Sequence, residues 1–255
     1  MRSLLQLVLI LFSCSPMMGA SADSPLPPVE KVTSYLDDLY RSQHSHARLA
    51  MSIKTKHFER TLEIESWTIG EQKALMVIRK PARESGTATL RTQDGLWNYA
   101  PRADRLVRIP TSLLSESWMG SHFTNDDLVR DSSFSTDFTT EVAWQKEDGL
   151  IRLMVRLIPK PDAPVVYTKV TFTLDKDSWL PLRTDWYDGD VIVRTTKYSD
   201  VRTFSGRQLP ATMTVVPSDS PSEFTSITYR SLEFAKPPKS SLFTPSGLRR
   251  AARRR

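Results

Sequence analysis

The regular alternation of apolar and polar residues is the feature that most restricts how this 255-residue chain can fold. From Ala47 onward, apolar side chains recur at every second position, which places them on one face of an extended strand. The clearest runs are Leu49, Met51 and Ile53; Leu62 and Ile64; Leu153, Val155 and Leu157; and Val166, Val170, Phe172 and Leu174. The sequence therefore predicts a sheet with one apolar face.

Three Asp-Gly pairs separate these runs and predict how the strands connect. Asp94-Gly95, Asp148-Gly149 and Asp188-Gly189 favour tight hairpins in which a residue adopts a positive φ. Hairpins join antiparallel neighbours, and the spacing of the turns indicates roughly ten to twelve strands. An antiparallel sheet of that size has to curl.

Two segments interrupt the strand pattern and predict helices. Behind Pro27 and Pro28, residues 28–41 carry apolar side chains at helical spacing. Between Thr111 and Arg130, Ser and Thr residues precede short apolar clusters. We predict an α+β fold in which both segments form a lid over a hydrophobic cavity, on the concave side of an incomplete antiparallel β-barrel.

The first residues have the composition of an export signal. Arg2 precedes an apolar core from Leu4 to Phe12, and Ala20-Ser21-Ala22 matches a signal-peptidase site. We predict cleavage after Ala22 and a periplasmic protein whose domain spans residues 23–248. An alternative is a bacterial lipobox at Leu11-Phe12-Ser13-Cys14, which would anchor the protein through a lipid on Cys14. No later segment is apolar enough to predict a membrane-spanning helix.

The positive charge of the chain is concentrated at its ends. The formal net charge is +6, and five of the arginines lie within residues 249–255, with another at position 2. The remainder is formally neutral, which argues against nucleic acid as a partner. We expect residues 249–255 to be a disordered basic tail, with attraction to anionic headgroups or an acidic partner as the alternative role.

Motifs for catalysis, metal or cofactor binding are missing from the sequence. It has no phosphate-binding glycine motif, no nucleophile elbow, no H-E-x-x-H and no pair of cysteines. His44, His46 and His57 are close in sequence, but a solvated helix-to-strand junction explains them better than a metal site. Glu63 and Glu65 fit the polar face of a strand. We predict a protein that is not an enzyme and binds no cofactor or metal.

The apolar residues are more informative than the polar ones. Six tryptophans and eight methionines are many for a chain with a neutral body. An apolar inner face either fills itself or leaves a dry cavity that binds an apolar ligand. We expect that cavity to be lined by Met51, Ile53, Leu62, Ile64, Leu75, Val77, Trp97, Trp118, Met119, Phe123, Val155, Phe172 and Trp186.

Several short motifs, in the same order, resemble those of one protein family. They are Arg48-Leu49-Ala50-Met51, Trp67-Thr68-Ile69-Gly70, Ile78-Arg79-Lys80-Pro81, Asp94 to Pro101, Ser117 to Ser121, Asp126-Asp127-Leu128, Lys197 to Val201, Gly206 to Pro210 and Leu242-Phe243-Thr244-Pro245. Together they are similar to the LolA-like family of outer-membrane lipoprotein-sorting proteins, whose type member is a periplasmic lipoprotein carrier.

The resemblance implies a function and a set of partners. The cargo would be lipidated proteins or lipids, taken from an inner-membrane transporter and given to an outer-membrane acceptor, with transient membrane contact and no nucleic acid. Arg79 and Lys80 match the basic segment that hands cargo on, although lysine replaces the usual arginine before Pro81. The family commonly has Gly-Ser-Asp where this chain has Gly120-Ser121-His122. The alternative is a sensor or assembly module of similar fold that acts through a protein partner.

Overall fold

The computed structural model describes residues 25–40, 42–70, 72–129, 133–163, 165–234 and 236–253, and for Asp126 and Val129 the backbone only. The signal cleavage after Ala22 and the alternative lipid anchor at Cys14 lie outside these residues, and both stay predictions. No helix in the described ranges is long and apolar enough to cross a membrane.

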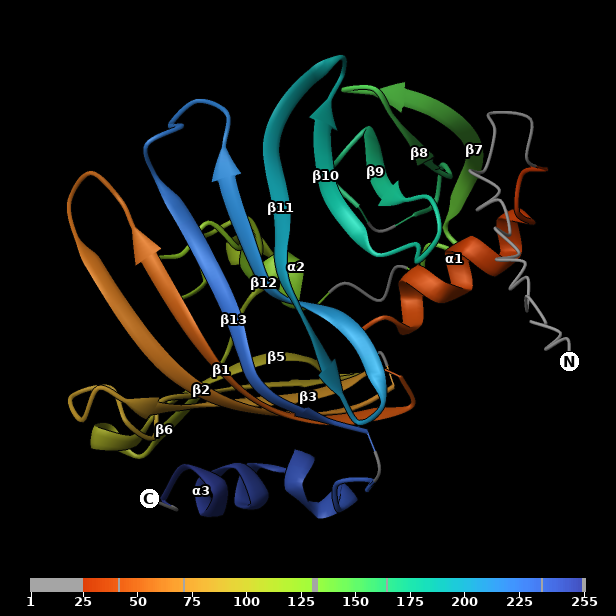
Figure 1. Ribbon diagram of the computed structural model, residues 1–255. Coiled ribbons are helices and arrows are strands. Elements are labelled where there is room, and N and C mark those ends of the chain that lie inside the picture. The colour runs from red at the N-terminus through yellow and green to blue at the C-terminus, as the bar shows by residue number, and fades with distance from the viewer. Residues whose placement is uncertain are drawn as a thin grey trace, which may run out of the picture.

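One continuous antiparallel sheet contains all thirteen strands of the described residues (Figure 1). The strands are β1 (His44–Lys54), β2 (Glu59–Ile69), β3 (Lys73–Lys80), β4 (Ala88–Thr92), β5 (Gly95–Ala100), β6 (Arg105–Arg108), β7 (Phe138–Glu147), β8 (Leu150–Pro159), β9 (Lys169–Asp175), β10 (Pro181–Asp188), β11 (Val191–Phe204), β12 (Arg207–Pro217) and β13 (Phe224–Glu233). Their spatial order is β6-β5-β4-β3-β2-β1-β13-β12-β11-β10-β9-β8-β7. The sheet is curved and not closed, which confirms the predicted incomplete barrel.

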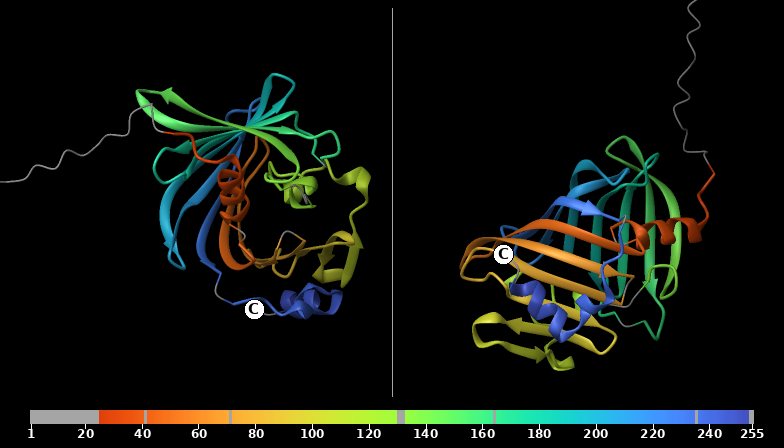
Figure 2. Two further views of the ribbon diagram at one scale, coloured as in Figure 1. Left: turned by 90° about the vertical axis from the view of Figure 1, so that its right-hand side faces the viewer. Right: turned by 90° about the horizontal axis from the view of Figure 1, so that it is seen from below.

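The helical elements are short and lie on both sides of this sheet. They are α1 (Val29–Asp38), η1 (Pro101–Ala103), η2 (Thr111–Leu113), η3 (Trp118–Gly120), α2 (Asn125–Val129), η4 (Ser240–Phe243) and α3 (Pro245–Arg253). Figure 2 shows α1 and the segment 111–129 inside the curve of the sheet, and α3 outside it. We call residues 111–129 the lid and the concave side of the sheet the hollow.

The Asp-Gly turns form hairpins as predicted. In the β7–β8 turn, Asp148 and Gly149 have φ values of +49° and +81°, and Glu147 pairs with Leu150 across a two-residue loop. Two successive positive φ values are the geometry whose twist matches that of the strands. Gly189 also has a positive φ, +58°, between the paired residues Asp188 and Val191.

α1 covers the half of the hollow formed by β7 to β10. Val32 and Leu36, four residues apart and therefore on one face of the helix, are buried against these strands. The buried cluster consists of Val32, Leu36, Phe138, Leu153, Val155, Leu157, Val170, Phe172 and Leu174. The predicted helix of residues 28–41 therefore exists and packs on the concave side.

The lid covers the other half of the hollow, over β1 to β3. Trp118 is 4% exposed and packs on a cluster of six buried side chains, Leu49, Met51, Ile53, Leu62, Ile64 and Ile78. At its far end, α2 starts with reciprocal hydrogen bonds. The Thr124 hydroxyl accepts from the Asp127 amide (3.1 Å), and the Asp127 carboxylate accepts from the Thr124 amide (2.8 Å).

The basic C-terminal segment is helical, so the prediction of a disordered tail was wrong for residues 249–253. Leu248, Ala251 and Ala252 form an apolar stripe that is buried against the convex side of β3 and β4. Glycine is required at position 247, because a Cβ there would lie 2.1 Å from the Ser241 carbonyl oxygen. The arginines between the buried residues concealed this stripe in the sequence.

Candidate functional site

Most of the residues predicted to line a cavity do lie on the concave side of the sheet, but in two separate groups. Met51, Ile53, Leu62, Ile64 and Trp118 share the cluster under the lid, with Met119 packed against it. Val155 and Phe172 belong to the cluster under α1, with Trp186 beside it. Phe123 is half-buried on the lid.

Leu75, Val77 and Trp97 face the opposite side of the sheet, and their assignment to the hollow was wrong. Leu75 and Val77 are fully buried beneath α3, and Trp97 packs against the same cluster. β3 carries apolar residues at consecutive positions, because Met76 and Ile78 face the hollow while Leu75 and Val77 face α3. A strand covered on both faces loses the alternation that would identify its inner side.

Three buried threonines separate the two apolar areas of the hollow. The strand register aligns one row across the sheet that runs from Ile53 through Thr225, Val215, Thr196 and Thr184 to Phe172. Thr225 and Thr184 are fully buried and Thr196 is 7% exposed. The hollow therefore has an apolar floor under the lid, an apolar floor under α1, and a polar centre.

The lid fills the space above its floor in this structure. The void between Trp118, Met119 and the facing strands has a volume of about 10 Å³. A cavity of that size holds one water molecule at most. Lipid or any other ligand of greater size could occupy this part of the hollow only if the lid moved away.

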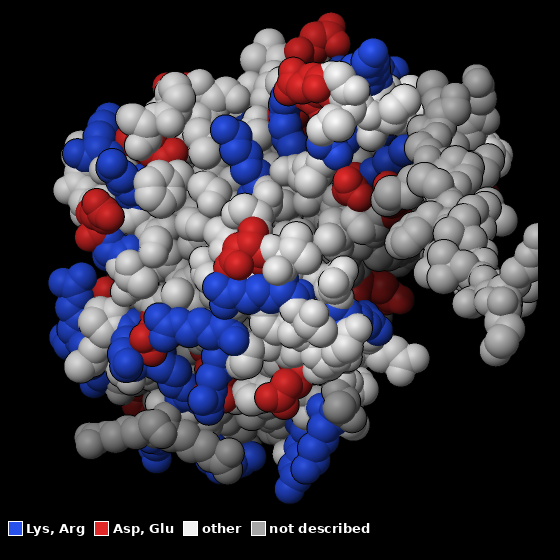
Figure 3. All heavy atoms as spheres, in the orientation of Figure 1, with Lys and Arg blue, Asp and Glu red and all other residues white. Residues whose placement is uncertain are grey.

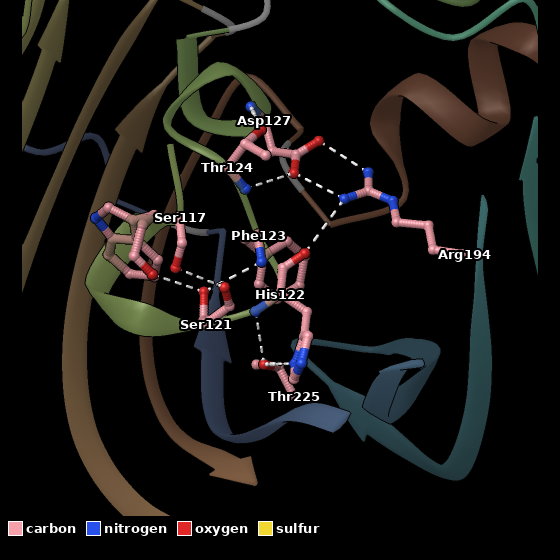
Figure 4. A network of polar contacts seen from close by, with 9 residues as sticks. Ser117, Ser121, His122, Phe123, Thr124, Asp127, Arg194 and Thr225 are labelled. Atoms are coloured by element: carbon pink, nitrogen blue, oxygen red, sulfur yellow. Dashed lines mark hydrogen bonds and ion pairs between the residues drawn. The ribbon is translucent and has the colours of Figure 1, made fainter. Parts of the chain in front are cut away.

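A bidentate ion pair attaches the lid to the far wall of the hollow (Figure 4). The two Nη atoms of Arg194, on β11, each lie 2.8 Å from one carboxylate oxygen of Asp127 at the start of α2. Their side chains are only 10% and 9% exposed. The contact is bidentate and charge-assisted, and both charges are largely removed from water.

Aromatic rings complete the surroundings of Arg194. The guanidinium carbon lies 4.6 Å from the ring centre of Trp186 and 4.9 Å from that of Tyr167. Burial by itself would lower the pKa of Arg194, but the hydrogen bonds and charge of Asp127 raise it above its ordinary value. Arg194 is therefore charged at neutral pH.

His122 makes a second attachment between the lid and the sheet. Its backbone amide donates to the Thr225 hydroxyl (3.0 Å), and its Nδ1 lies 2.9 Å from the same oxygen (Figure 4). Its Nε2 is 3.4 Å from a carboxylate oxygen of Glu223. His122 thus contacts the polar centre of the hollow.

The third attachment joins the lid to β2 and β4. The Trp118 indole donates to the Thr89 hydroxyl (3.1 Å), and Arg60 donates to the Met119 carbonyl oxygen. Arg60 also pairs with Glu84 at 3.1 Å. The lid is therefore held by polar contacts at Asp127, His122 and Met119, and by the buried ring of Trp118. No local sequence pattern indicates the roles of Arg194 and Arg60, because their partners are distant in the chain.

Arg79 and Lys80 lie on the convex side, away from the lid. Arg79 pairs with Glu65 at 2.6 Å and donates to the Ala251 carbonyl oxygen of α3 at 2.9 Å. Lys80 is 70% exposed and lies 3.2 Å from Glu63. The structure thus gives Arg79 a structural role at α3, and it places neither side chain in the hollow.

The histidines and acidic residues form no metal centre in the described residues, where no group of three potential ligands is found. His46 instead pairs with Glu65 at 2.8 Å and stacks on Trp67, with ring centres 5.2 Å apart. Glu65 is thus surrounded by His46 and Arg79. Burial would raise its pKa, but hydrogen bonds from these two side chains lower it below its ordinary value.

A separate, open cleft of about 470 Å³ lies between α1, the β9–β10 turn and the β11–β12 hairpin. Its lining mixes charged, hydroxyl and apolar side chains, namely Lys31, Ser34, Tyr35, Asp38, Leu39, Ser178, Leu180, Arg207, Gln208 and Leu209. Such a lining does not resemble the dry, apolar site that the sequence predicts.

Comparisons with solved structures identify the same fold in three bacterial proteins. A DUF1329 family protein from Desulfovibrio piger matches with a TM-score of 0.75 at 23% identity, covering 88% of this chain and all of the other. An outer membrane lipoprotein-sorting protein domain from Vibrio parahaemolyticus has a TM-score of 0.71, 22% identity and coverages of 87% and 97%. A LolA superfamily protein from Nitrosomonas europaea has a TM-score of 0.70 at 19% identity, covering 86% of this chain and 98% of the other.

The family of this chain follows from sequence comparison. No curated protein matches this chain. One family model, described as "Uncharacterized protein", matches residues 70–250, which is more than half of the chain. The chain therefore belongs to that family, and its fold is the LolA-like fold of lipoprotein-sorting proteins.

Proposed function

We propose that this protein is a periplasmic carrier that shelters the acyl chains of lipoproteins or lipids in the hollow of its sheet. The observation that carries the proposal is that one short segment, the lid, covers the apolar floor over β1 to β3. Over β1 to β3, the buried side chains are closed off by Trp118, Met119 and Leu128 of one short lid. A lid of this kind can be displaced as a unit without breaking the sheet beneath it.

The free energy gained by burying an acyl chain is larger than the free energy needed to open the lid. Exposing a buried tryptophan costs about 5 kcal/mol, at roughly 25 cal/mol per Å² for a side chain of about 200 Å². An acyl chain of about fifteen methylenes gains about 12 kcal/mol when it is fully buried, at about 0.8 kcal/mol per methylene. One chain on the apolar floor can therefore offset the opening of the lid.

Transfer needs a donor and an acceptor. We propose an inner-membrane transporter as donor and an outer-membrane acceptor, as the sequence resemblance implies. Because no covalent chemistry is involved, release follows when the acceptor offers a better apolar site or favours lid closure over the empty floor. The buried threonines at the centre of the hollow limit how far an apolar chain extends from one floor to the other.

The test uses delipidated protein and a fluorescent tripalmitoylated cysteine peptide. We expect wild-type protein to bind the peptide, and Trp118→Ala to bind at least tenfold more tightly, since it raises the fraction of molecules with an open lid. Trp97→Ala is the matched control, because it removes the same side chain from the convex side.

Two results would contradict the proposal. One is that neither wild type nor Trp118→Ala binds the acylated peptide while both remain folded by circular dichroism. The other is that Trp118→Ala and Trp97→Ala change affinity equally. A stable complex with an envelope protein, without acyl binding, would instead support the sensor or assembly module.

A further inference from the structure

Cationic side chains gather on the part of the convex side that surrounds α3. They are Arg48, Arg79, Lys80, Arg83, Arg102, Arg230, Arg249, Arg250 and Arg253, and the carboxylates that pair with some of them are Glu63, Glu65, Glu84 and Asp104. Figure 3 shows basic side chains gathering at the lower left of the view, where β1, β2 and β13 approach α3. This part of the convex side therefore carries more positive than negative side chains.

The strongest part of this surface surrounds the end of α3. We call Arg83, Arg102, Arg249, Arg250 and Arg253 the arginine patch. Arg102 donates to the Arg83 carbonyl oxygen (3.1 Å), which brings η1 next to the β3–β4 turn. A Cβ at Gly86, in that turn, would lie 3.1 Å from the Ala252 carbonyl oxygen, which brings the same turn next to α3.

The carboxylates near the patch do not neutralise it. Asp104 lies 3.2 Å from Arg249, and Glu84 is shared between Arg83 at 3.4 Å and Arg60 of the lid contact at 3.1 Å. Arg102, Arg250 and Arg253 are exposed, and Arg83 is 68% exposed. The sequence continues with Arg254 and Arg255, which add to the same end of the chain.

We propose that the arginine patch docks the protein on an anionic phospholipid surface. The patch contains only arginine, whose planar guanidinium forms paired hydrogen bonds to phosphate oxygens that a lysine ammonium cannot form. Because the patch is convex and the lid concave, docking leaves the lid free to open. This inference extends the proposed carrier function, since it places the protein where acyl chains are available, but it is measured independently of acyl binding.

The experiment measures partition of the full protein onto vesicles of phosphatidylcholine with and without phosphatidylglycerol. We expect binding only to the anionic vesicles and a decline with added salt. Replacing Arg250 and Arg253 together by glutamine should weaken binding by about 30-fold at low salt, since each cation contributes roughly a factor of five at such a surface. Glutamine preserves helix propensity, so α3 should persist.

A matched control removes the same charge elsewhere. Lys146 and Arg156 are exposed on the β7–β8 hairpin, and replacing both by glutamine should leave vesicle binding unchanged. Should the first double variant misfold by circular dichroism, Arg83→Gln with Arg102→Gln tests the other part of the patch.

Three outcomes would overturn the inference. They are equal binding to neutral and anionic vesicles, an equal loss in the β7–β8 control, and binding of polyglutamate without binding of anionic vesicles, which would indicate an acidic protein partner. Acyl-peptide binding should be unchanged in the patch variant. If wild-type protein failed to bind the acyl peptide, the carrier function would be rejected, and the inference about the arginine patch would stand.

Discussion

Replacing Asp127 by asparagine tests whether the lid is held by its buried ion pair. The substitution keeps the shape of the side chain and its hydrogen bond from the Thr124 amide, and it removes the charge that faces Arg194. A buried charge that loses its partner destabilises the state in which it is buried by roughly 3 kcal/mol. Because Arg194 regains water when the lid opens, that cost applies to the closed lid.

Asp127→Asn should change the opening of the lid strongly and the rest of the protein much less. A cost of about 3 kcal/mol corresponds to a change of about 150-fold in the equilibrium between closed and open lid. Amide hydrogen exchange of peptides from residues 111–129 should therefore accelerate by about two orders of magnitude at neutral pH. Exchange in β8 and β9, which pack under α1, should not change.

An exposed pair of the same residue types provides the control. Asp200 lies 2.6 Å from Arg202, with side chains 41% and 49% exposed. An exposed ion pair contributes at most about 1 kcal/mol, so Asp200→Asn should leave exchange of the lid at the wild-type rate. If Asp127→Asn and Asp200→Asn gave the same exchange rates in residues 111–129, the reasoning on the buried pair would be refuted.

Three further predictions concern substitutions on the convex side of the sheet. Glu65→Gln should reduce stability by about 1 kcal/mol at pH 7. Because the folded-state pKa of Glu65 is lowered, this difference should be complete above about pH 4.3, its unfolded pKa, and should shrink as the pH falls through the folded-state pKa, in denaturant titrations at pH 7 and pH 3. Arg79→Ala should lower stability by about 2 kcal/mol and speed exchange in α3, because it removes hydrogen bonds to Glu65 and Ala251. Lys80→Ala should stay within about 0.5 kcal/mol of wild type, since Lys80 is exposed; a larger loss for Lys80→Ala than for Arg79→Ala would contradict these assignments.

The strands and the helical insertions could be predicted because their signals are local. Alternation over β1 and β8 and positive φ at turns such as Asp148-Gly149 depend only on neighbours in the chain. Curvature followed from the number of strands. Met51, Ile53, Leu62 and Ile64 could be placed together on one face, because β1 and β2 have one apolar face each, and their role in binding cargo stays a prediction.

What the sequence did not reveal depends on contacts between distant residues. α3 buries Leu248 between arginines, and a basic helix cannot be distinguished from a basic tail until the surface beneath it is known. Which residues of β3 face the hollow can be recognised only when the elements that cover each face of the strand are known. The pairing of Asp127 with Arg194 joins residues 67 positions apart, and only the curvature of the whole sheet brings β11 opposite the lid.

The contacts of the lid are of two kinds: polar contacts that fix its position, and an apolar contact that cargo can replace. The ion pair between Arg194 and Asp127 fixes the position of the lid, yet its net contribution to closure is small, because both charges recover their hydration when they separate. The burial of Trp118 then provides most of the energy that holds the lid closed, and an acyl chain that takes the place of its ring on the same floor recovers that energy.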